Sequence, residues 1–303
     1  MNNPIPSKTG FKSGFITITG APNAGKSTLL NHLLGEKISI TSKKPQTTRN
    51  RILGVVHRPM SQLIFLDTPG VHRPRDPLGT RMVDEAIAAI SDGDVVLMIV
   101  DVSKPLPDEE AFLIRQIKSV HKPVVLALNK IDLIERNQIL VFIKRWSEAY
   151  SFEAIIPISA KHGIQMDDLL SRMETLLPEG PPFFPEETLT DAPERFITAE
   201  MIREKVFRLT GQEVPYSTAV TIDQFSEEKN GELIRIHATI HVERDSQKGI
   251  IIGKSGSKLK KIGEDARKDI ERMLGTKVFL KLFVRIQKNW SKDTKALRKF
   301  GYS

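Results

Sequence analysis

The stretch from Gly20 to Thr28 constrains the fold of this chain more than any other feature of its sequence. It matches the pattern G-x-x-x-x-G-K-[ST], with Gly20, Gly25, Lys26 and Ser27 at the required positions. A strand-like run precedes it and leucines at helical spacing follow it. Glycines let several backbone N–H groups surround one phosphate, while the lysine reaches the outer phosphates and the hydroxyl binds Mg²⁺. The stretch therefore predicts a nucleoside triphosphate site formed by Gly20, Ala21, Pro22, Asn23, Ala24, Gly25, Lys26, Ser27 and Thr28.

Length and composition are those of a soluble chain with two domains. Of 303 residues, 40% are hydrophobic and 27% charged, and there is no cysteine, which excludes disulfides, thiolate metal sites and cysteine nucleophiles. Residues 1–6 lack the charged-then-apolar design of a signal peptide, and no apolar run approaches the ~18 residues of a membrane span. We therefore expect a cytoplasmic protein.

Strand and helix patterns alternate along the first 180 residues. Several of the strands are nearly continuous runs of Val, Ile and Leu, which is typical of strands covered on both faces. We therefore predict an α/β domain over residues 1–180, with a doubly wound, mostly parallel sheet that binds ligands at the carboxyl ends of its strands. The expected strands are 14–19, 51–56, 62–66, 94–100, 124–128 and 154–157, and the expected helices are 26–34, 79–90, 109–120, 137–150 and 166–177.

Further motifs follow predicted strands, where such a sheet places its ligands. Asp67 ends the third strand and suits the Mg²⁺ shell, and Gly70 lets its backbone N–H approach a terminal phosphate. Asp132, after the fifth strand, offers a carboxylate that accepts hydrogen bonds from the ring N–H and exocyclic amine of guanine, which adenine lacks. The backbone after the sixth strand is expected to contact the base carbonyl. The predicted nucleotide-binding residues here are Asp67, Thr68, Pro69, Gly70, Val71, Asn129, Lys130, Ile131, Asp132, Ser159, Ala160 and Lys161.

With all three motifs in this order, residues 15–177 resemble the GTPase domain of the translation-factor-related P-loop proteins. The resemblance implies GTP hydrolysis, with GTP, GDP and Mg²⁺ as ligands. It also implies that the polar stretch 42–50 is the first switch, in which a threonine hydroxyl completes the Mg²⁺ shell. Thr48 is our choice for that threonine, and Thr47 is the alternative. The metal ligands are then expected to be Ser27, Thr48 and Asp67, and the catalytic residues Lys26, Thr48, Gly70 and Asn23.

Two positions depart from Ras-like GTPases. Val71 stands where those enzymes place a glutamine that orients the attacking water, so another residue, the backbone or a partner must position it, and we expect slow intrinsic turnover. Asn23 replaces a glycine of the Ras-like loop. GTPases of the hydrophobic-substituted class that carry asparagine here often use it to bind K⁺ beside the phosphates. We therefore predict K⁺-stimulated hydrolysis, with a loop-shaping role for Asn23 as the alternative.

The excess positive charge of the chain lies in its C-terminal third. Residues 193–303 contain 23 Lys and Arg against 15 Asp and Glu, a net of +8, and residues 1–192 are balanced. This asymmetry suggests a polyanionic partner, either nucleic acid or a membrane surface, and a well-solvated surface is the alternative. The preceding segment 181–192 continues a stretch with four prolines in residues 178–185, and it is predicted to be an extended, stiff interdomain linker.

Residues 193–303 predict a second domain with the element order α-β-β-α-α-β. An amphipathic helix ends near Leu209, and strands 217–225 and 233–242 flank a hairpin turn at Lys229, Asn230 and Gly231. A further helix carries apolar residues from Leu259 to Met273, and a last strand spans 278–286.

Gly253-Lys-Ser-Gly256, between the two later helices, makes this domain resemble the type II KH module. A Gly-x-x-Gly turn lets a nucleic-acid backbone pack closely, with helix N–H groups and lysines facing phosphates. Ile251, Ile252, Leu259 and Ile262 are candidates for the floor of a base-binding groove, although some of them must serve the core. The predicted RNA-binding residues are Ile251, Ile252, Gly253, Lys254, Ser255, Gly256, Lys258, Leu259 and Lys261.

A P-loop GTPase domain followed by a KH module closely resembles the Era family of ribosome-assembly GTPases over nearly the whole chain. The resemblance implies a monomer that binds the 3′ end of small-subunit ribosomal RNA and the small ribosomal subunit, and is released on GTP hydrolysis. It also implies peripheral contact with the cytoplasmic face of the inner membrane. Two other readings stay open: an ATP-using P-loop enzyme, against which Asp132 argues, and a static RNA-binding scaffold with a vestigial GTPase.

Overall fold

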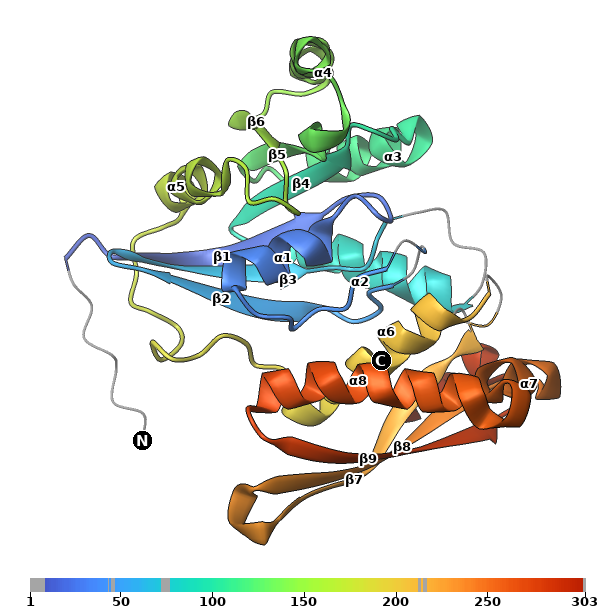
Figure 1. Ribbon diagram of the computed structural model, residues 1–303. Helices are drawn as coiled ribbons and strands as arrows, with labels where there is room; N and C mark the ends of the chain where they lie inside the picture. The colour runs from blue at the N-terminus through green and yellow to red at the C-terminus, as the bar shows by residue number, and fades with distance from the viewer. Residues whose placement is uncertain are drawn as a thin grey trace. The chain divides into compact units, whose positions relative to one another are not determined.

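The computed structural model describes residues 9–301, apart from 43, 45–46, 72–76, 212–213 and 215–216. The chain divides into two compact units (Figure 1). The first comprises Met1–Ser39, Thr48–Arg75 and Gly79–Asp191, and the second comprises Ile40–Thr47, Asp76–Leu78 and Ala192–Ser303. The short segment 40–47 therefore groups with the C-terminal part of the chain, although it lies within the predicted GTPase domain.

Among its described residues, the first unit contains a six-stranded sheet with the order β2-β3-β1-β4-β5-β6. Strand β2 runs antiparallel to β3, and all the other neighbours are parallel. This confirms the predicted α/β fold. The strands are β1 (Lys12–Thr19), β2 (Ile52–Arg58), β3 (Ser61–Asp67), β4 (Val95–Asp101), β5 (Val124–Asn129) and β6 (Ala154–Ile158), and the helices are α1 (Lys26–Leu34), α2 (Pro77–Asp92), α3 (Pro107–Lys118), η1 (Ile131–Leu133), α4 (Arg136–Ala149) and α5 (Met166–Leu176).

Helices cover both faces of this sheet, which explains why its central strands are apolar without alternation. Every residue of β3 and β5 is buried. Helices α1 and α5 contact the β1–β3 part of the sheet, whereas Ala86 of α2, Leu113 of α3 and Trp146 of α4 join one core cluster with Met98 of β4 and Leu126 of β5 (Figure 1). The parallel strands end at one edge, and the predicted nucleotide motifs follow those ends.

The proline-rich segment expected to link the domains belongs to the first unit up to Asp191. Ser13 Oγ donates to the carbonyl of Pro181 over 2.6 Å, and the backbone N of Val55 donates to Leu189 over 2.8 Å. Gln62 accepts from the backbone N of Phe184 over 3.0 Å. The segment is thus an extended strap along β1, β2 and β3. Prolines suit it because an extended strap needs few of its own backbone donors.

Among its described residues, the second unit has a mixed sheet in the order β7-β8-β9, in which β7 is antiparallel to β8 and β9 is parallel to β8. Helices α6 and α8 pack on each other and on this sheet, and Ile262, Ala266 and Ile270 form the buried stripe of α8 (Figure 1). The expected order α-β-β-α-α-β is present, which confirms the KH-like topology. The elements are α6 (Glu194–Leu209), β7 (Ala219–Glu228), β8 (Leu233–Val242), α7 (Asp245–Ile252), η4 (Lys254–Gly256), α8 (Ser257–Leu274) and β9 (Lys277–Ile286).

The turn between β7 and β8 has the predicted hairpin chemistry. Asn230 and Gly231 both have positive φ, 54° and 91°, in the short helical turn η3 (Lys229–Gly231). Two consecutive left-handed residues match the right-handed twist of a hairpin, and asparagine and glycine tolerate that conformation best.

A C-terminal cap that the sequence patterns did not predict follows β9. It contains η5 (Trp290–Lys292) and α9 (Thr294–Lys299), and Trp290 is fully buried, with its indole N–H donating to Ser217 O over 3.0 Å. Phe300 packs 4.6 Å from the ring of His241, ring centre to ring centre, and burial lowers the pKa of His241 to about 4. The sequence offered one local hint of this cap, a tryptophan that follows the last predicted strand.

No helix within the described part of the chain combines the length and the apolar character needed to cross a membrane.

Candidate nucleotide site and nucleic-acid interface

The loop from Gly20 to Gly25 joins β1 to α1 at the carboxyl edge of the sheet. A Cβ on Gly20 would lie 2.4 Å from Ile99 O, and a Cβ on Gly25 would lie 2.2 Å from Asn129 Nδ2. Gly25 also has a φ of 108°, which other residues rarely adopt. Space therefore requires glycine at both positions, and backbone conformation also requires it at position 25. Asn23 has a φ of 64°, and asparagine is one of the few other residues that tolerate it.

Lys26 is held over this loop by its own backbone. Its Nζ donates to the carbonyls of Gly20 over 3.0 Å and Ala21 over 3.1 Å. Burial lowers the pKa of Lys26 to about 8, against the opposing effect of the Asp67 carboxylate. A buried ammonium beside the loop is suited to pair with the negative charge of bound phosphates.

Three predicted metal ligands meet at the end of β3. Ser27 Oγ lies 2.8 Å from Thr48 Oγ1 and donates to Asp67 Oδ2 over 2.7 Å. Ser39 Oγ donates to the same carboxylate oxygen over 2.9 Å. Thr48, rather than Thr47, thus reaches this cluster, since the Thr47 hydroxyl donates to Lys44 O.

The second carboxylate oxygen of Asp67 supports a cation at this place. Oδ1 is buried and has no hydrogen-bond partner among the described residues, and burial raises the pKa of Asp67 despite its two serine donors. A hard cation such as Mg²⁺ binds carboxylate and hydroxyl oxygens and would satisfy this buried acceptor. The oxygens of Ser27, Thr48 and Asp67 therefore fit the predicted ion. Ser39 was missed by the sequence analysis because it belongs to no motif and lies far from Asp67 in the chain.

Gly70 and Val71 lie directly against the phosphate-binding loop. A Cβ on Gly70 would lie 2.9 Å from the Cα of Pro22, and Val71 N donates to Gly20 O over 3.1 Å. The Val71 side chain is fully buried in the core, so it neither reaches a water nor carries a group to orient one. The backbone between Asp67 and Val71 is thereby positioned beside the loop, as the motif predicts.

The base-recognition motif is tied to the loop by one side chain. Asn129 Nδ2 donates to Ala24 O over 2.7 Å, and Asn129 Oδ1 accepts from Ala160 N over 3.0 Å. Asn129 is buried, so it connects its own motif with the phosphate-binding loop and with the segment at Ala160 through two desolvated hydrogen bonds. Lys130, in the left-handed conformation, donates to Asn23 O over 2.8 Å and pairs with Asp101. Asp101, at the end of β4, belongs to no predicted motif.

Asp132 is held by two side chains that follow β6. Its Oδ1 accepts from Ser159 Oγ over 2.6 Å, and its Oδ2 lies 3.6 Å from His162 Nε2. The Ser159 hydroxyl thus links the segment after β6 to the carboxylate that is predicted to bind guanine. The carboxylate retains acceptor capacity for the two N–H groups that guanine presents.

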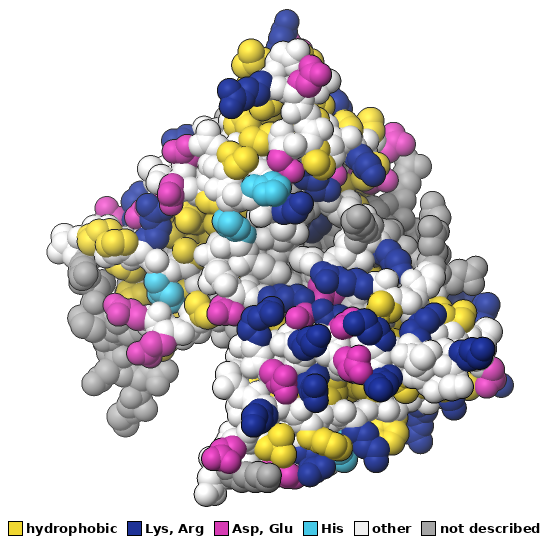
Figure 2. Space-filling model, viewed as in Figure 1, with side chains coloured by type: hydrophobic (Ala, Val, Ile, Leu, Met, Phe, Trp, Pro, Cys, Tyr) yellow, Lys and Arg dark blue, Asp and Glu magenta, His cyan; other side chains and the backbone are white. Residues whose placement is uncertain are grey.

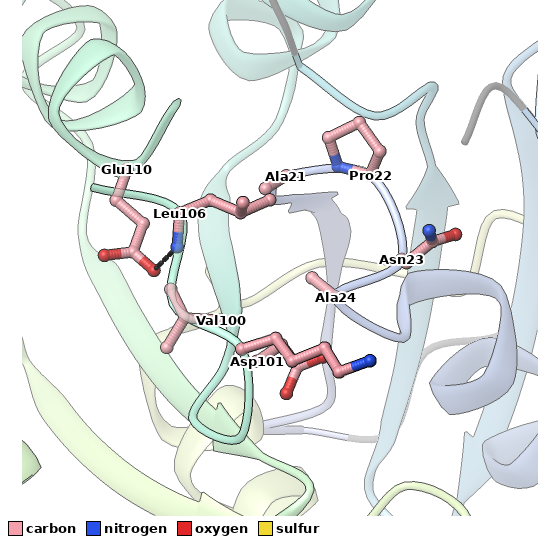
Figure 3. Close-up of a pocket in the computed structure, with 9 residues that line it drawn as sticks. Ala21, Pro22, Asn23, Ala24, Val100, Asp101, Leu106 and Glu110 are labelled. Atoms are coloured by element: carbon pink, nitrogen blue, oxygen red, sulfur yellow. Dashed lines mark hydrogen bonds between the residues drawn. The ribbon is translucent and has the colours of Figure 1, made fainter. Parts of the chain in front are cut away.

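A small cavity of about 180 Å³ lies on the α3 side of the loop (Figure 3). Leu106 N donates to Glu110 Oε1 over 3.0 Å at its wall, and Leu106, Ala21 and Pro22 give it an apolar lining (Figure 3). Its volume is below the several hundred Å³ of usual small-molecule pockets. We assign it no ligand.

The Gly-x-x-Gly turn of the second unit has the exposed backbone that the motif predicts. Gly253 and Gly256 have φ of 71° and 78°, and Ser255 between them has φ of 50°. Lys254 and Ser255 are exposed, and Lys258 and Leu259 are half-buried. Lys261 is exposed and forms an ion pair with Asp265 over 2.9 Å, which raises its pKa.

Two candidate groove residues face the core instead. Ile251 and Ile262 are fully buried, so neither side chain is available to a base. Ile252 and Leu259 remain partly exposed. The periodicity of a helix identifies an apolar stripe, but it does not tell which members of that stripe lie at the edge of the core.

A groove of about 550 Å³ runs between α8 and β9 beside this turn. A second recess of about 880 Å³ continues along the same pair of elements and shares Arg267 with the first. Lysine and arginine side chains gather over this part of the second unit (Figure 2). The contribution of β9 to this groove could not be predicted from local sequence patterns, because it depends on how a strand distant in sequence pairs in the sheet. The lining of the first groove is Gly256, Leu259, Lys260, Gly263, Glu264, Arg267, Phe279, Leu280, Lys281 and Leu282.

Comparisons with known proteins identify a GTPase domain and a KH domain in this chain. The family profile described as 50S ribosome-binding GTPase matches residues 15–130, and the KH domain profile matches residues 213–291. GTPase Era of Geobacter metallireducens is 53% identical over 293 residues, which are 97% of this chain and 98% of the relative. GTPase Era of Staphylococcus haemolyticus is 45% identical over 294 residues, 97% of this chain and 98% of the relative.

The chain belongs to the Era family of GTPases.

Solved structures of Era are also similar in fold. One is Era in complex with MgGDPNP and nucleotides 1506–1542 of 16S ribosomal RNA, with a TM-score of 0.93, 42% identity, and coverage of 97% of this chain and 99% of that one. Another is a variant of Aquifex aeolicus Era bound to GDP·AlF₄⁻, with a TM-score of 0.93, 41% identity, and coverage of 97% and 100%. The expected GTPase activity and KH fold of this Era-family chain are thereby confirmed.

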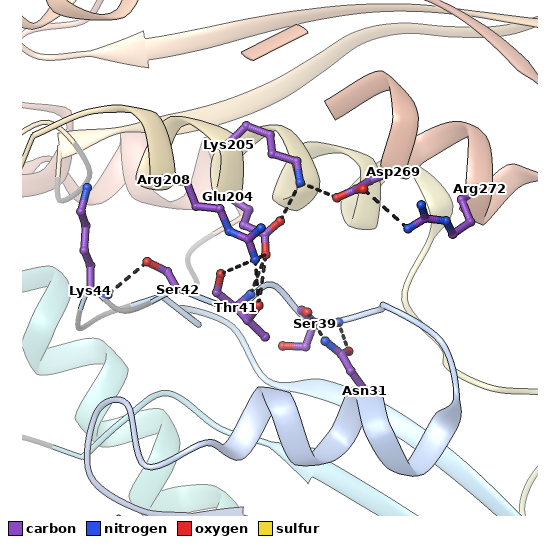
Figure 4. A network of polar contacts seen from close by, with 10 residues as sticks. All are labelled: Asn31, Ser39, Thr41, Ser42, Lys44, Glu204, Lys205, Arg208, Asp269 and Arg272. Atoms are coloured by element: carbon purple, nitrogen blue, oxygen red, sulfur yellow. Dashed lines mark hydrogen bonds and ion pairs between the residues drawn. The ribbon is translucent and has the colours of Figure 1, made fainter. Parts of the chain in front are cut away.

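The segment 40–47 of this Era-family chain is bound within the second unit (Figure 4). Glu204 Oε1 accepts from Thr41 N over 3.0 Å and from Arg208 over 2.9 Å. Lys44 Nζ donates to the carbonyls at the end of α6, including Phe207 and Thr210. A lysine satisfies the free carbonyls of a helix C-terminus and complements its dipole. Residues 43, 45 and 46 of the predicted switch lie outside the described residues.

Helix α6 also binds the C-terminal end of segment 40–47, at Thr47, and helix α8. Arg203 is fully buried, pairs with Glu200 and donates to Thr47 O. Lys205 pairs with Glu204 over 3.1 Å and with Asp269 of α8 (Figure 4). The polar residues of α6 therefore hold the segment and α8 through one buried network, which the amphipathic pattern of α6 did not reveal.

Proposed function

We propose that this chain is a GTP-driven switch that binds single-stranded RNA at the 3′ end of small-subunit ribosomal RNA and assists assembly and maturation of the small ribosomal subunit. The observation that carries the proposal is the pairing of two built sites in one chain. One is the guanine-nucleotide cluster around Asn129 and Asp132, and the other is the groove between α8 and β9. The Era structure that contains nucleotides 1506–1542 of 16S ribosomal RNA supports the choice of RNA.

In the proposed mechanism, the loop backbone and Lys26 bind the phosphates, and Asp132 accepts from guanine. Ser27, Thr48 and Asp67 would hold Mg²⁺, which would supply positive charge beside the phosphate oxygens. Gly70, which lies against the phosphate-binding loop, would offer its backbone N–H to the terminal phosphate. Thr48 would report the presence of that phosphate because its hydroxyl lies beside Ser27 among the proposed metal ligands.

In this mechanism the side chain of Val71 does not position the attacking water. Val71 is buried and apolar, so backbone groups or a bound partner must orient the attacking water. We therefore propose slow intrinsic turnover that RNA or the ribosomal subunit accelerates. Asn23, exposed beside the loop, is the proposed K⁺ ligand. Turnover in matched KCl and NaCl tests this role, and equal rates would eliminate it.

The proposed coupling of nucleotide to RNA passes through the segment that ends at Thr48. Thr41 and Lys44 are bound to α6, and Lys205 of α6 pairs with Asp269 of α8, the helix that lines the RNA groove. In this proposal a change at Thr48 passes along the backbone to Thr41 and Lys44, and then through the hydrogen bonds and the ion pair of α6 to the helix that lines the groove.

RNA affinity in two nucleotide states tests this function. The full chain is crosslinked to total cellular RNA with GDPNP or with GDP, and the bound sites are mapped. The proposal expects enrichment of the 3′ end of small-subunit RNA in the GDPNP state. Identical RNA binding in both states would instead favour a static scaffold, and the absence of ribosomal RNA would refute the assigned partner.

We also propose that the chain acts as a monomer in the cytoplasm and contacts the cytoplasmic face of the membrane peripherally. The net charge of +8 in residues 193–303 supports contact with an anionic surface. Flotation with vesicles containing anionic lipid, compared with neutral vesicles, measures this contact, and sedimentation measures the oligomeric state.

A further inference from the structure

The outward side chains of β9 alternate between cations and aromatic rings. Residues 277, 279, 281, 283 and 285 are all exposed, whereas the intervening residues are buried or half-buried. In chain order the exposed set reads Lys277, Phe279, Lys281, Phe283 and Arg285. Aromatic rings interleaved with cations are the composition with which proteins bind single-stranded nucleic acid, because rings stack on bases and cations pair with phosphates.

The two rings of this set are open to solvent and are flanked by further planar and charged groups. Phe279 and Phe283 are each 44% exposed, a large fraction for phenylalanine. The ring of His237 on β8 lies 6.4 Å from Phe279 and 6.3 Å from Phe283, ring centre to ring centre. Arg235 lies 4.7 Å from the ring centre of Phe279, and Lys281 lies 5.1 Å from that of Phe283.

Charge is sorted across this face of the sheet. The carboxylates lie on β7, where Glu228 pairs with Arg235 and Asp223 accepts from Thr239. Among the described residues, Lys277, Lys281 and Arg285 form no ion pair with a carboxylate. The β9 side of the face is therefore available to a polyanion, while the β7 side is not.

The face is continuous with the groove between α8 and β9. Phe279 and Lys281 line that groove as well as the outer face, because β9 is the edge strand of the sheet. Phe283 does not line the groove. It lies four residues from Phe279, about 13 Å along a strand, a distance that about two nucleotides of a stretched single strand cover. A strand that leaves the groove across β9 thus meets Phe283 next.

We propose that the outer face of β9 is a second RNA subsite, in which Phe279 and Phe283 stack on bases of the same single strand that occupies the groove, and Lys281 and Arg285 pair with its phosphates. This inference rests on the proposed RNA-binding function and extends it beyond the roughly four nucleotides that a KH groove takes. The face binds stacked bases rather than a fixed sequence, since every base offers a π-face.

Probe length separates the outer face from the groove. The full chain, loaded with GDPNP and Mg²⁺, is titrated with fluorescein-labelled RNAs from the segment 1506–1542. One is a four-nucleotide probe, and two are twelve-nucleotide probes that extend the same four nucleotides toward the 5′ or the 3′ end. Phe283→Ala is expected to weaken one long probe about tenfold and to leave the short probe unchanged. Phe283→Leu keeps the apolar volume but lacks the aromatic face, so it is expected to weaken the same long probe as Phe283→Ala does. It replaces the alanine variant in the experiment if that variant fails to fold.

Two further variants complete the experiment. Phe283→Trp should retain the affinity for the long probe and add tryptophan fluorescence that this probe quenches and the short probe does not. Leu140→Ala removes an apolar side chain on α4 that is 70% exposed, and it should change neither affinity.

The outcomes distinguish this inference from the function on which it rests. If the unaltered chain binds none of the probes, the proposed RNA function fails. If it binds them but Phe283→Leu binds both long probes as tightly as the unaltered chain, the outer subsite alone is refuted. A change of oligomeric state in the Phe283 variants, with unchanged RNA affinity, would likewise refute it, because the face would then be a contact between copies of the chain.

Discussion

Truncation of Asn129 to alanine tests whether one buried amide holds the nucleotide site together. Asn129 donates to Ala24 O over 2.7 Å and accepts from Ala160 N over 3.0 Å, so the variant leaves one acceptor and one donor without their partner. Each buried group that loses its partner costs about 1–3 kcal/mol. The loss is therefore about 2–6 kcal/mol, shared between stability and nucleotide affinity.

The assay separates these two shares. Displacement of a fluorescent GDP analogue gives the association and dissociation rates, and thermal unfolding gives the change in stability. If half of a mid-range loss falls on affinity, about 2 kcal/mol, we expect Kd for GDP to rise about 30-fold, mainly through faster dissociation. GTP affinity should fall by the same factor, because Asn129 contacts the loop and the base motifs rather than the terminal phosphate. At saturating GTP, kcat should change much less than Kd.

A matched variant controls for the loss of an asparagine as such. Asn137 is exposed at the start of α4, and Asn137→Ala should alter neither affinity nor unfolding temperature. The reasoning is refuted if Asn129→Ala binds GDP within about threefold of the unaltered chain while its fold is intact.

Three other changes have defined outcomes. Asp132→Asn should weaken GTP by at least about tenfold and improve XTP, measured by competition, because the amide no longer accepts both guanine N–H groups. Glu204→Gln weakens the clamp on Thr41, so the ratio of RNA affinities in the GDPNP and GDP states should shrink while basal GTP hydrolysis is retained. Burial lowers the pKa of His241 to about 4, with Asp223 opposing and Arg285 and Lys299 reinforcing the shift. The unfolded chain then binds a proton that the folded chain does not, so stability should fall as the pH drops from about 6.5 toward 4, by roughly 1–2 kcal/mol at pH 5. Urea unfolding at pH 7.5 and pH 5 measures this, and His241→Asn should remove the difference.

The nucleotide site was predictable from sequence because its chemistry is local. Gly25, Lys26 and Ser27 act through the backbone of one turn, and Asp67 and Asp132 follow strands whose parallel ends must meet at one edge. The doubly wound, mostly parallel character of the sheet followed from the alternation of strand and helix patterns. The Thr48 hydroxyl lies 2.8 Å from Ser27 Oγ, which supports the prediction of Thr48 rather than Thr47 as the switch threonine.

Contacts between residues far apart in sequence could not be predicted in this way. Ser39 reaches Asp67 because the chain after α1 returns across the end of β3, and no motif records that path. The contacts of residues 181–191 with β1, β2 and β3, and those of segment 40–47 with α6, likewise follow no local pattern. Polar segments of this kind carry no apolar period, so their partners are decided by where free donors and acceptors of other elements lie.

By itself, the sequence determined the element order, the guanine-nucleotide motifs, the Gly-x-x-Gly turn and the basic character of the C-terminal part. Each of these depends on spacing along one stretch of chain or on composition. Only the tertiary structure decided which side of each element faces the core. It placed Ile251 and Ile262 inside, and Phe279 and Phe283 outside, because an alternating strand shows two faces and the strand's neighbours determine which one is covered.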